Sequence, residues 1–261
     1  MKVLDKYPLM PKSIISLPRN NKERLLRKGR KKGKGDTYFT ESSRSKLSYF
    51  DETLCEFILK YYARDCKRIF DPFAGWGERH FKSKELGYNY TGVDVSQKAI
   101  DFAKDVFNVT NILGDSSSTI FSDNSFDFCF SCPPYYNLEK YESCKGQLTD
   151  AKQYIHFLFG ITHVIREIRR VTKPKSLTAF VIGDFRRRGI FYPFTIDMFN
   201  IFRKESFHPF DCVIIDKAAN YRLPMFLGQA DRLGYTVKIH EYLWVFSNNK
   251  KEKNETNKTK L

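Results

Sequence analysis

The chain has 261 residues, enough for one sizeable α/β domain with extensions. Lys and Arg outnumber Asp and Glu by 45 to 30, and residues 1–35 hold twelve of these cations against two acids. This uneven excess favours a polyanionic partner, with a solvated tail or a targeting signal as the alternative. Six scattered cysteines argue against a secreted disulfide scaffold. The sequence has neither a signal core nor a bilayer-length apolar run, so we expect a cytoplasmic protein.

Residues 1–46 are basic and interrupted by Pro8, Pro11 and Pro18, and they show no sustained helical or strand period. We therefore expect a flexible N-terminal arm, then one folded domain over residues 47–248 and a disordered polar tail over 249–261. Asp51 is placed to cap the first helix of the domain, because apolar side chains recur after it at helical spacing.

Two strand-and-turn units follow this helix. Residues 67–77, KRIFDPFAGWG, predict a strand that runs into a turn and then a helix. In the turn, Gly75 and Gly77 would let backbone N–H groups approach a ligand. Residues 88–95 predict the second strand, with Ser96 capping the next helix, and a short third strand covers about 109–113.

The stretch 125–141, SFDFCFSCPPYYNLEKY, predicts a buried strand that stops abruptly. Three phenylalanines alternate with other residues, and Pro133 and Pro134 then prevent further ladder pairing. Tyr135 and Tyr136 follow at the carboxyl edge of the sheet, where open α/β folds bind ligands. Flat side chains at that edge indicate a site for a planar substrate.

The second half of the chain continues the alternation of strands and helices. One helix is predicted from Asp150 until Pro174 ends it, and another begins at Pro193. Strands are predicted at 177–185, 210–216 and 237–246. Such an alternation forms a mostly parallel sheet, here of seven strands with helices on both faces. Because the last two strands leave no room for a clear helix between them, we expect an antiparallel edge strand.

Together, the glycine turn and the later CPPY resemble the S-adenosylmethionine-dependent DNA amino-methyltransferases, which methylate exocyclic amines of bases. From about residue 48 to residue 246, the order of elements and phrases such as CPPYYNLEKY, VTKPKSLTAFVIGDFR and VKIHEYLWVF are similar to phage-type members. The resemblance implies a Rossmann-like class I methyltransferase fold, S-adenosylmethionine as cofactor and double-stranded DNA as partner. It also implies base flipping and direct in-line transfer to adenine N6 or cytosine N4, as in restriction-modification systems or viruses.

Candidate cofactor residues lie at the ends of the first three strands. A carboxylate at the end of the second strand can accept both ribose hydroxyls, so Asp94 is expected in that role, with an exposed helix cap as the alternative. The resemblance pairs Asp115 with the adenine amino group, although Gly-Asp is also ordinary turn chemistry. Asp71 is expected to meet the cofactor's ammonium or to brace the glycine turn. Trp76 stands where the family usually has a small residue, with packing on the first helix as its alternative. The expected set also contains Phe73, Ala74, Gly75, Gly77 and Val95.

An exocyclic amine is a poor nucleophile because its lone pair is delocalised into the ring. In the resembled family, an Asp, Asn or Ser before two prolines accepts one amine hydrogen bond, the first proline carbonyl accepts another, and an aromatic residue stacks on the base. These places are Cys132, Pro133 and Tyr135 here, with Pro134 between them. A thiol is a weaker acceptor than a carboxylate or a hydroxyl, so Cys132 does not identify the base.

Other interpretations of Cys132 stay open at this point. Ser131 or the carbonyl of Pro133 could supply the main acceptor. Cys132 could be a covalent nucleophile as in cytosine-C5 methyltransferases, although those carry the thiol after a proline, or it could be a plain buried thiol. A zinc site with Cys129 is disfavoured because no second Cys or His pair lies nearby, so we expect no metal.

Cationic side chains near strand ends suit phosphate contacts that carry no sequence information, and solvated surface is the alternative. Residues 217–235 are a possible small target-recognition insert. The alternative functions are an RNA amino-methyltransferase, acting on guanine N2 or adenine N6, and a catalytically silent nucleic-acid-binding relative. The expected nucleic-acid contacts are Tyr136, Lys140, Arg186, Arg187, Arg188, Lys217 and Arg222 in the domain, and Lys28, Arg30, Lys31 and Lys32 in the arm.

Overall fold

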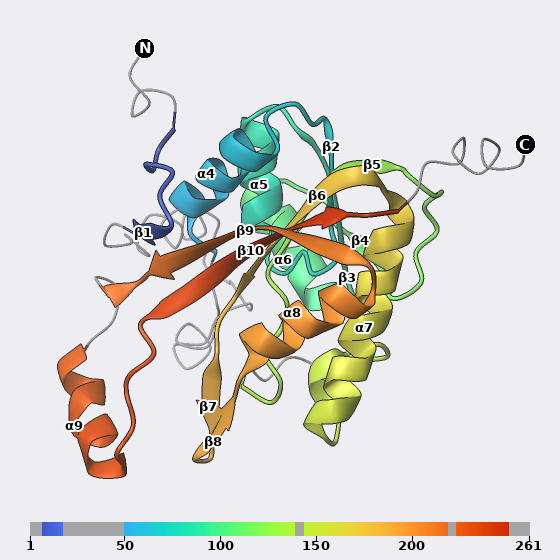
Figure 1. Ribbon diagram of the computed structural model, residues 1–261. Helices are drawn as coiled ribbons and strands as arrows, with labels where there is room; N and C mark the ends of the chain where they lie inside the picture. The colour runs from blue at the N-terminus through green and yellow to red at the C-terminus, as the bar shows by residue number, and fades with distance from the viewer. Residues whose placement is uncertain (1–6, 18–49, 139–143, 219–222, 251–261) are drawn as a thin grey trace, which may run out of the picture.

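A mixed sheet with helices on both faces organises the computed structural model, which describes residues 7–17, 50–138, 144–218 and 223–250 (Figure 1). The strands are β1 (Ile14–Ser16), β2 (Arg68–Asp71), β3 (Asn89–Asp94), β4 (Ile112–Leu113), β5 (Phe126–Ser131), β6 (Thr172–Ile182), β7 (Phe185–Arg187), β8 (Ile190–Tyr192), β9 (Phe207–Asp216) and β10 (His240–Asn248). Eight of them form the main sheet, in the order β1-β9-β10-β6-β5-β2-β3-β4. Its pairings are parallel except those that β10 makes with β6 and β9, and β7 pairs with β8 in a separate antiparallel hairpin.

Two helices of the described residues begin where capping residues predict. The carboxylate of Asp51 accepts from the N–H of Leu54 at 3.0 Å, and the hydroxyl of Ser96 accepts from the N–H of Ala99 at 3.2 Å, so both predicted caps are confirmed. The helices are α4 (Glu52–Tyr62), α5 (Glu78–Glu85), α6 (Gln97–Phe107), α7 (Tyr154–Val171), α8 (Phe194–Lys204) and α9 (Leu223–Leu233), with a 3-10 turn at Leu148–Asp150.

Two apolar layers hold these helices on opposite faces of the sheet. On one face, α4 packs Phe57 and Ile58 against strand residues that include Phe130. On the other face, α7 and α8 pack against the sheet around Phe157 and Phe180, and all five side chains are 0% exposed. The predicted Rossmann-like arrangement with helices on both faces is therefore confirmed. No described helix is both long and apolar enough to cross a bilayer.

The carboxyl ends of the parallel strands meet along one edge of the sheet, which we call the carboxyl rim. The β7–β8 hairpin follows β6 and α9 follows β9, so both project from this rim (Figure 1). Arg188 and Gly189 form the hairpin turn with φ of 50° and 81°, the pair of positive values that a type I′ turn requires. The strand ends that form the rim are Asp71, Asp94, Ser131, Ile182 and Asp216.

The expectation of a flexible arm over residues 1–46 is wrong for residues 7–17. Residues 14–16 pair in parallel with the end of β9 and make an eighth strand where seven were expected. Ile15 and Leu17 are 4% and 3% exposed, and the N–H of Leu17 donates to the carbonyl of Asp216 at 2.9 Å. Nearby prolines concealed this strand, because an edge strand tolerates prolines that an interior strand does not.

The antiparallel strand is not at the edge of the sheet, as the sequence led us to expect. β10 lies between β6 and β9, and the edges are β1 and β4. The interval thought too short for a clear helix contains α9. Gly228 in its middle lowers the helical propensity of this segment, which explains why it was missed.

The ends of α7 and of the chain also differ from expectation. The helix begins at Tyr154 after a 3-10 turn, not at Asp150, and it ends at Val171, so Pro174 lies within β6. Beyond β10, the ammonium of Lys250 donates to two carbonyls at the end of α7, at 3.0 and 2.8 Å. Residues 249 and 250 therefore belong to the folded part, and the rest of the predicted tail lies outside the described residues.

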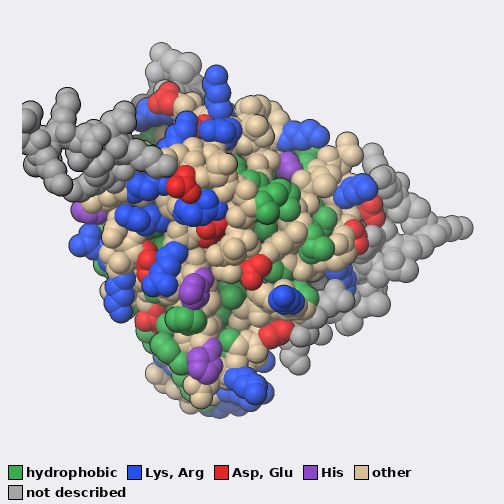
Figure 2. All heavy atoms as spheres, turned by 90° about the vertical axis from the view of Figure 1, so that its right-hand side faces the viewer, with side chains coloured by type: hydrophobic (Ala, Val, Ile, Leu, Met, Phe, Trp, Pro, Cys, Tyr) green, Lys and Arg blue, Asp and Glu red, His purple; other side chains and the backbone are tan. Residues whose placement is uncertain are grey.

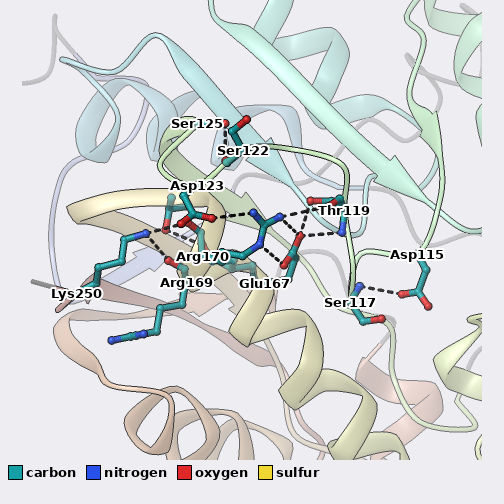
Figure 3. A network of polar contacts seen from close by, with 12 residues as sticks. Asp115, Ser117, Thr119, Ser122, Asp123, Ser125, Glu167, Arg169, Arg170 and Lys250 are labelled. Atoms are coloured by element: carbon teal, nitrogen blue, oxygen red, sulfur yellow. Dashed lines mark hydrogen bonds and ion pairs between the residues drawn. The ribbon is translucent and has the colours of Figure 1, made fainter. Parts of the chain in front are cut away.

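A polar network ties the loop between β4 and β5 to α7 (Figure 3). Glu167 accepts from the N–H and the hydroxyl of Thr119 at 2.8 and 2.5 Å, and Arg170 bridges Glu167 and Asp123. Although burial alone would raise it, the hydrogen bonds from Arg170 and Thr119 lower the pKa of Glu167. The carboxylate therefore stays ionised and holds the loop that carries Asp115.

Replacing Ile15 with Ala should lower the free energy of unfolding by about 2–4 kcal/mol, because truncation of a buried Ile leaves a cavity. The matched change Ile14→Ala, at a neighbouring side chain that is 56% exposed, should shift it by less than about 0.5 kcal/mol. Urea unfolding measures both. If both substitutions changed the free energy of unfolding by nearly zero, residues 7–17 would be a flexible arm as first expected.

Candidate active site

Two loops leave neighbouring strands at the carboxyl rim. Loop 72–77 follows β2 and loop 132–135 follows β5, and these strands pair in parallel. Asp71 joins the loops, because its Oδ1 accepts from the N–H of Phe73 at 2.9 Å and from the hydroxyl of Ser131 at 2.5 Å. The glycine turn and the CPPY elbow therefore start side by side.

Three N–H groups of the glycine loop already have acceptors within the protein. Those of Phe73 and Gly75 donate to the carboxylates that end β2 and β3, and that of Ala74 donates to a carbonyl of β3. The expectation that the N–H of Gly75 approaches a ligand is therefore not supported, and for Gly77 it stays a prediction. Gly75 has a φ of +56°, a backbone conformation that favours glycine, and a Cβ there would have the Phe73 carbonyl at 3.9 Å as its nearest neighbour.

The second half of the loop packs against α6. A Cβ on Gly77 would lie 2.6 Å from the Cβ of Ala103, so this glycine permits close contact between the loop and the helix. Trp76 packs edge-on against Phe102 at 5.3 Å between ring centroids. It therefore contacts α6 and not the first helix of the domain, α4.

Asp94 ends β3, and Asp115 follows β4. Asp94 accepts from the N–H groups of Gly75 at 2.8 Å and Ser96 at 2.9 Å, and burial raises its pKa. Because the cap of α6 is the hydroxyl of Ser96, Asp94 does not serve as the helix cap. Asp115 is exposed and accepts from the N–H of Ser117 at 2.8 Å, the turn contact considered above. Each carboxylate keeps acceptor positions for ligand donors.

The chain beyond the CPPY elbow returns to the ends of β3 and β4, which the sequence did not predict. The thiol of Cys144 lies 3.3 Å from the carbonyl of Val95 in a hydrogen bond. A Cβ on Gly146, whose φ is +88°, would lie 3.2 Å from Val95 and 3.3 Å from Asp115 Oδ2. This returning segment therefore lies against two of the predicted cofactor residues.

Asp71 is fully buried and accepts two further hydrogen bonds, from Arg79 Nε at 2.6 Å and from the hydroxyl of Tyr90. Of its two predicted roles, these contacts favour bracing the turn over meeting a cofactor ammonium. Arg79 was missed because an Arg in the first turn of a helix is usually exposed to solvent. Tyr90 was missed because a Tyr in a strand usually serves only as a packing side chain.

Tyr135 has a fixed orientation at the rim. Its hydroxyl accepts from the N–H of Gly183 at 2.8 Å, and its ring makes edge contacts with Phe185 and Phe194 at 5.5 and 5.7 Å between centroids. Cys132 is half-buried and packs against the core layer of α4. Sequence reasoning missed Gly183, because only the fold brings the end of β6 to this ring.

Tyr136 lies in the core, so its prediction as a nucleic-acid contact is wrong. It is 8% exposed, and its hydroxyl donates to the carbonyl of Lys152 at 3.1 Å. Its ring packs among Tyr154, Phe157 and Tyr192. The two adjacent tyrosines therefore have different roles.

The neighbours of Cys132 on β5 are inaccessible. Ser131 and Cys129 are both 0% exposed, and Ser131 donates its hydroxyl to Asp71. The alternative that Ser131 supplies the main acceptor for a substrate is therefore not supported. Among the described residues, no three His, Cys, Asp or Glu side chains are grouped so that they could hold a metal ion.

The predicted arginines of the β7–β8 hairpin differ in their surroundings. The guanidinium of Arg186 lies 5.2 Å from the ring centroid of Phe191 and 4.6 Å from that of Tyr235, so it holds the hairpin to the segment after α9. Arg187 Nε is buried without a hydrogen-bond partner among the described residues, and Arg188 is exposed at the turn. Arg188 therefore has donors to offer an anion, whereas Arg186 Nε is buried as Arg187 Nε is.

The other predicted cations give less support to a phosphate role. Lys217 forms an ion pair with Glu241 at 2.7 Å. Figure 2 shows one face on which Lys and Arg side chains are dispersed with acidic side chains between them, not gathered in one stripe. Six predicted contacts lie outside the described residues: Lys28, Arg30, Lys31, Lys32, Lys140 and Arg222.

Comparison with known families matches residues 126–261, more than half of the chain, to the DNA methylases. The chain belongs to the DNA methylase family. A second family, described as a methyltransferase domain, matches residues 71–144, which contain the glycine loop and the CPPY elbow. The predicted methyltransferase is thereby confirmed, and the phage-type origin stays a prediction. No curated protein matches this chain.

The fold is widely shared, since 959 chains of solved structures match it. The (4+2)-cyclase SpnF matches with a TM-score of 0.53 and 16% identity, over 75% of this chain and 80% of that chain. A SAM-dependent methyltransferase from Methanosarcina mazei has a TM-score of 0.49 and 16% identity, over 77% and 98%. A TehB-like methyltransferase from Corynebacterium glutamicum has a TM-score of 0.48 and 15% identity, over 87% and 97%. The match to SpnF shows the fold alone, and because SpnF is a cyclase, the fold does not determine the reaction.

S-adenosylmethionine is the cofactor of class I methyltransferases, and the rim fits this molecule. The carboxylates of Asp94 and Asp115 have remaining acceptor positions for hydroxyl and amino groups. The chain therefore has acceptors suited to this cofactor beside its CPPY elbow.

Glu78, the first residue of α5, yields a pH-dependent prediction. It is 4% exposed, its Oε1 has no hydrogen-bond partner among the described residues, and burial raises its pKa to about 7. An acid with a raised folded-state pKa destabilises the fold once it ionises. This penalty is absent below the unfolded-state pKa, grows as pH rises from about 4.5, and is complete above about 7.

Glu78→Gln should therefore raise the free energy of unfolding above pH 7 by up to roughly 3 kcal/mol, and should change it little near pH 4.5. Glu85→Gln on the same helix is the control, since its side chain is 44% exposed and its pairing with Lys82 is worth less than about 1 kcal/mol. Thermal unfolding at several pH values measures both. A shift in Glu78→Gln that does not grow with pH would contradict the burial of an ionised Glu78.

Proposed function

We propose that this protein transfers a methyl group from S-adenosylmethionine to an exocyclic amine of a DNA base, at adenine N6 or cytosine N4. The observation that carries the proposal is the link through Asp71, which holds the glycine loop beside the CPPY elbow. Adjacent strands are about 4.8 Å apart, so groups bound over these two loops would be neighbours. Membership of the DNA methylase family supports DNA as the substrate.

On the cofactor side, Asp94 would accept the ribose hydroxyls and Asp115 the adenine amino group. Both carboxylates accept hydrogen bonds from backbone N–H groups, which direct them toward the place where the cofactor would bind. When bound, S-adenosylmethionine supplies an electrophilic methyl group on a sulfonium. Phe73, Gly75 and Val95 would line this region, whereas the predicted Ala74 is 1% exposed and the predicted Gly77 packs on α6.

On the substrate side, Tyr135 would stack on a base flipped out of the duplex. The carbonyl of Pro133 and the thiol of Cys132 would accept the two amine hydrogens and draw the nitrogen toward tetrahedral geometry. Pro134 lacks an N–H and has a restricted φ, which stiffens the elbow. In this proposal no covalent intermediate with the protein forms, so catalysis would consist of positioning and preorganised acceptors.

The hairpin is well placed to contact the DNA backbone. Phe185, the first residue of β7, packs on the ring of Tyr135, so the hairpin begins beside the proposed base site. Arg187 and Arg188 would bind phosphates there, and Arg186 would hold the hairpin in position. The insert at 217–235 would contribute α9 to the same rim.

The basic run in the N-terminal region would also contact phosphate. Two described residues flank it, and both lie at the carboxyl rim: Leu17 bonds to the end of β9, and Phe50 packs on Phe130 near the end of β5 at 5.3 Å between centroids. The cations of this run are thus joined to the domain close to the proposed DNA site. They include Lys28, Arg30, Lys31 and Lys32.

Incubation with methyl-labelled cofactor and duplex DNA or RNA, then digestion to nucleosides and mass spectrometry, identifies the methylated base. Tyr135→Ala should lower kcat/KM by roughly 10- to 100-fold, because stacking of one base is worth about 1–3 kcal/mol, and should leave cofactor affinity unchanged. Phe210→Ala is the matched control, since this aromatic side chain is 60% exposed in the first half of β9, away from the rim.

The outcomes of this experiment separate the candidate functions. N6-methyladenine or N4-methylcytosine in DNA supports the proposal and names the base. Labelled RNA without labelled DNA would make RNA the substrate. If calorimetry detects DNA binding but no cofactor binding, the protein is a catalytically silent binding relative.

Neutralising the basic run tests its role without disturbing β1, which a deletion of residues 1–35 would remove. Changing Lys28, Arg30, Lys31 and Lys32 together to Gln should weaken DNA binding and reduce the slope of log K against log salt by about 3 to 4, if each cation meets one phosphate. A control variant changes four cations near the amino ends of the parallel strands, away from the carboxyl rim, to Gln: Lys60, Arg64, Lys67 and Lys204. This variant should keep the wild-type slope. Equal slopes in both variants would make the run a solubility feature.

A further inference from the structure

The carboxylate of Asp71 is 0% exposed and connects four parts of the fold. Its Oδ1 accepts from Phe73 N–H in the glycine loop and from the Ser131 hydroxyl at the end of β5, at 2.9 and 2.5 Å. Its Oδ2 accepts from Arg79 Nε in α5 at 2.6 Å and from the hydroxyl of Tyr90 in β3. Each oxygen therefore has two donors, and each donor belongs to a different element.

Arg79 strengthens this connection. Its side chain is 7% exposed, it also donates to the carbonyl of Phe73, and its guanidinium lies over the rings of Phe50 and Phe130 at 5.2 and 6.0 Å. Although burial alone would lower it, the charge of Asp71 raises the pKa of Arg79 well above its usual range. Arg79 therefore stays protonated, and both side chains of the pair are enclosed.

A buried ion pair is an inefficient way to stabilise a fold, because the desolvation of both charges offsets most of their attraction. Apolar residues of similar volume stabilise a core as well or better. What this pair provides is a fixed distance between the groups that it contacts. Those groups are both polar atoms of the Phe73 backbone and the hydroxyl of Ser131, the residue before Cys132.

We propose that Asp71, Arg79 and Ser131 couple the two loops, so that a cofactor that orders the glycine loop also orders the Cys132–Tyr135 elbow. The inference rests on the proposed function, because it takes the glycine loop as the cofactor side and the elbow as the base side. These three are positioning residues that act through Phe73 and Cys132. Such coupling is reciprocal, so a bound base would tighten cofactor binding by the same factor. It also gives the weak thiol acceptor a fixed position.

Hydrogen exchange of the full chain, with and without S-adenosylhomocysteine, tests the coupling without turnover. In the wild type, the ligand should slow amide exchange at least about threefold in residues 73–77 and in residues 135–138. Ser131→Ala leaves Asp71 bonded to Phe73 and Arg79 but removes its bond to β5. The ligand should then protect only 73–77, with a Kd within about twofold of wild type, while kcat falls about 10- to 100-fold.

Ser83→Ala is the matched control. Ser83 is also 0% exposed and donates its hydroxyl to the carbonyl of Arg79 at 2.6 Å, but it does not connect the loops. This variant should keep ligand protection in both segments and the wild-type kcat. A loss of protection in both variants would assign the effect to general loosening of the core and overturn the coupling.

Two other results distinguish failure of the coupling from failure of the proposed function. Unchanged ligand protection of 135–138 in Ser131→Ala, or none there in the wild type, overturns the coupling and leaves the proposed methylation intact. If the wild type does not bind S-adenosylhomocysteine, the proposed function fails and the coupling fails with it.

Discussion

The fully buried carboxylate of Asp71 is the constraint on which the carboxyl rim depends. A charge buried alone would cost several kcal/mol, so Asp71 is compatible with the fold only because donors from four elements converge on it. This requirement draws Arg79 inward, which sets the start of α5, and it fixes the strand ends on either side of β2. The geometry of both loops follows from that one anchoring point.

The alternation of strands and helices made most of the fold predictable, because side-chain period and caps are local properties. Asp51 and Ser96 mark their helix starts through hydrogen bonds within one turn, and the phenylalanines of β5 mark a buried strand. Strand order is not local. Nothing in the sequence of β10 states that it inserts between β6 and β9, and the three residues of β1 are too few to show a period among prolines. The turn residues Arg188 and Gly189 are not the Asn-Gly pair that signals a hairpin.

The candidate site was predictable where a residue's place in the chain determines its neighbours. It was not predictable where the three-dimensional fold determines them. Carboxylates at strand ends reach the rim in any parallel sheet, so Asp71 and Asp94 were identified. The opposite fates of Tyr135 and Tyr136 were not, because the two prolines end the strand period that would have assigned each ring to a face. Arg79 could not be predicted for a similar reason. A charged side chain is expected to be exposed unless a buried partner for it is known, and the sequence does not show that partner.

Gly183 constrains the family beyond this chain. A Cβ at this position would lie 3.3 Å from the Tyr135 hydroxyl and 3.2 Å from Glu241, so a bulkier residue could remain only if the tyrosine or β10 moved away. Gly183 directly follows β6 and lies far from the CPPY elbow along the chain. It nevertheless limits the positions that the aromatic ring of that elbow can adopt. Methylases with a larger residue at the equivalent place need another anchor for the ring, or an aromatic residue without a hydroxyl. That one position offers a way to sort relatives into structural subgroups before any of their structures is known.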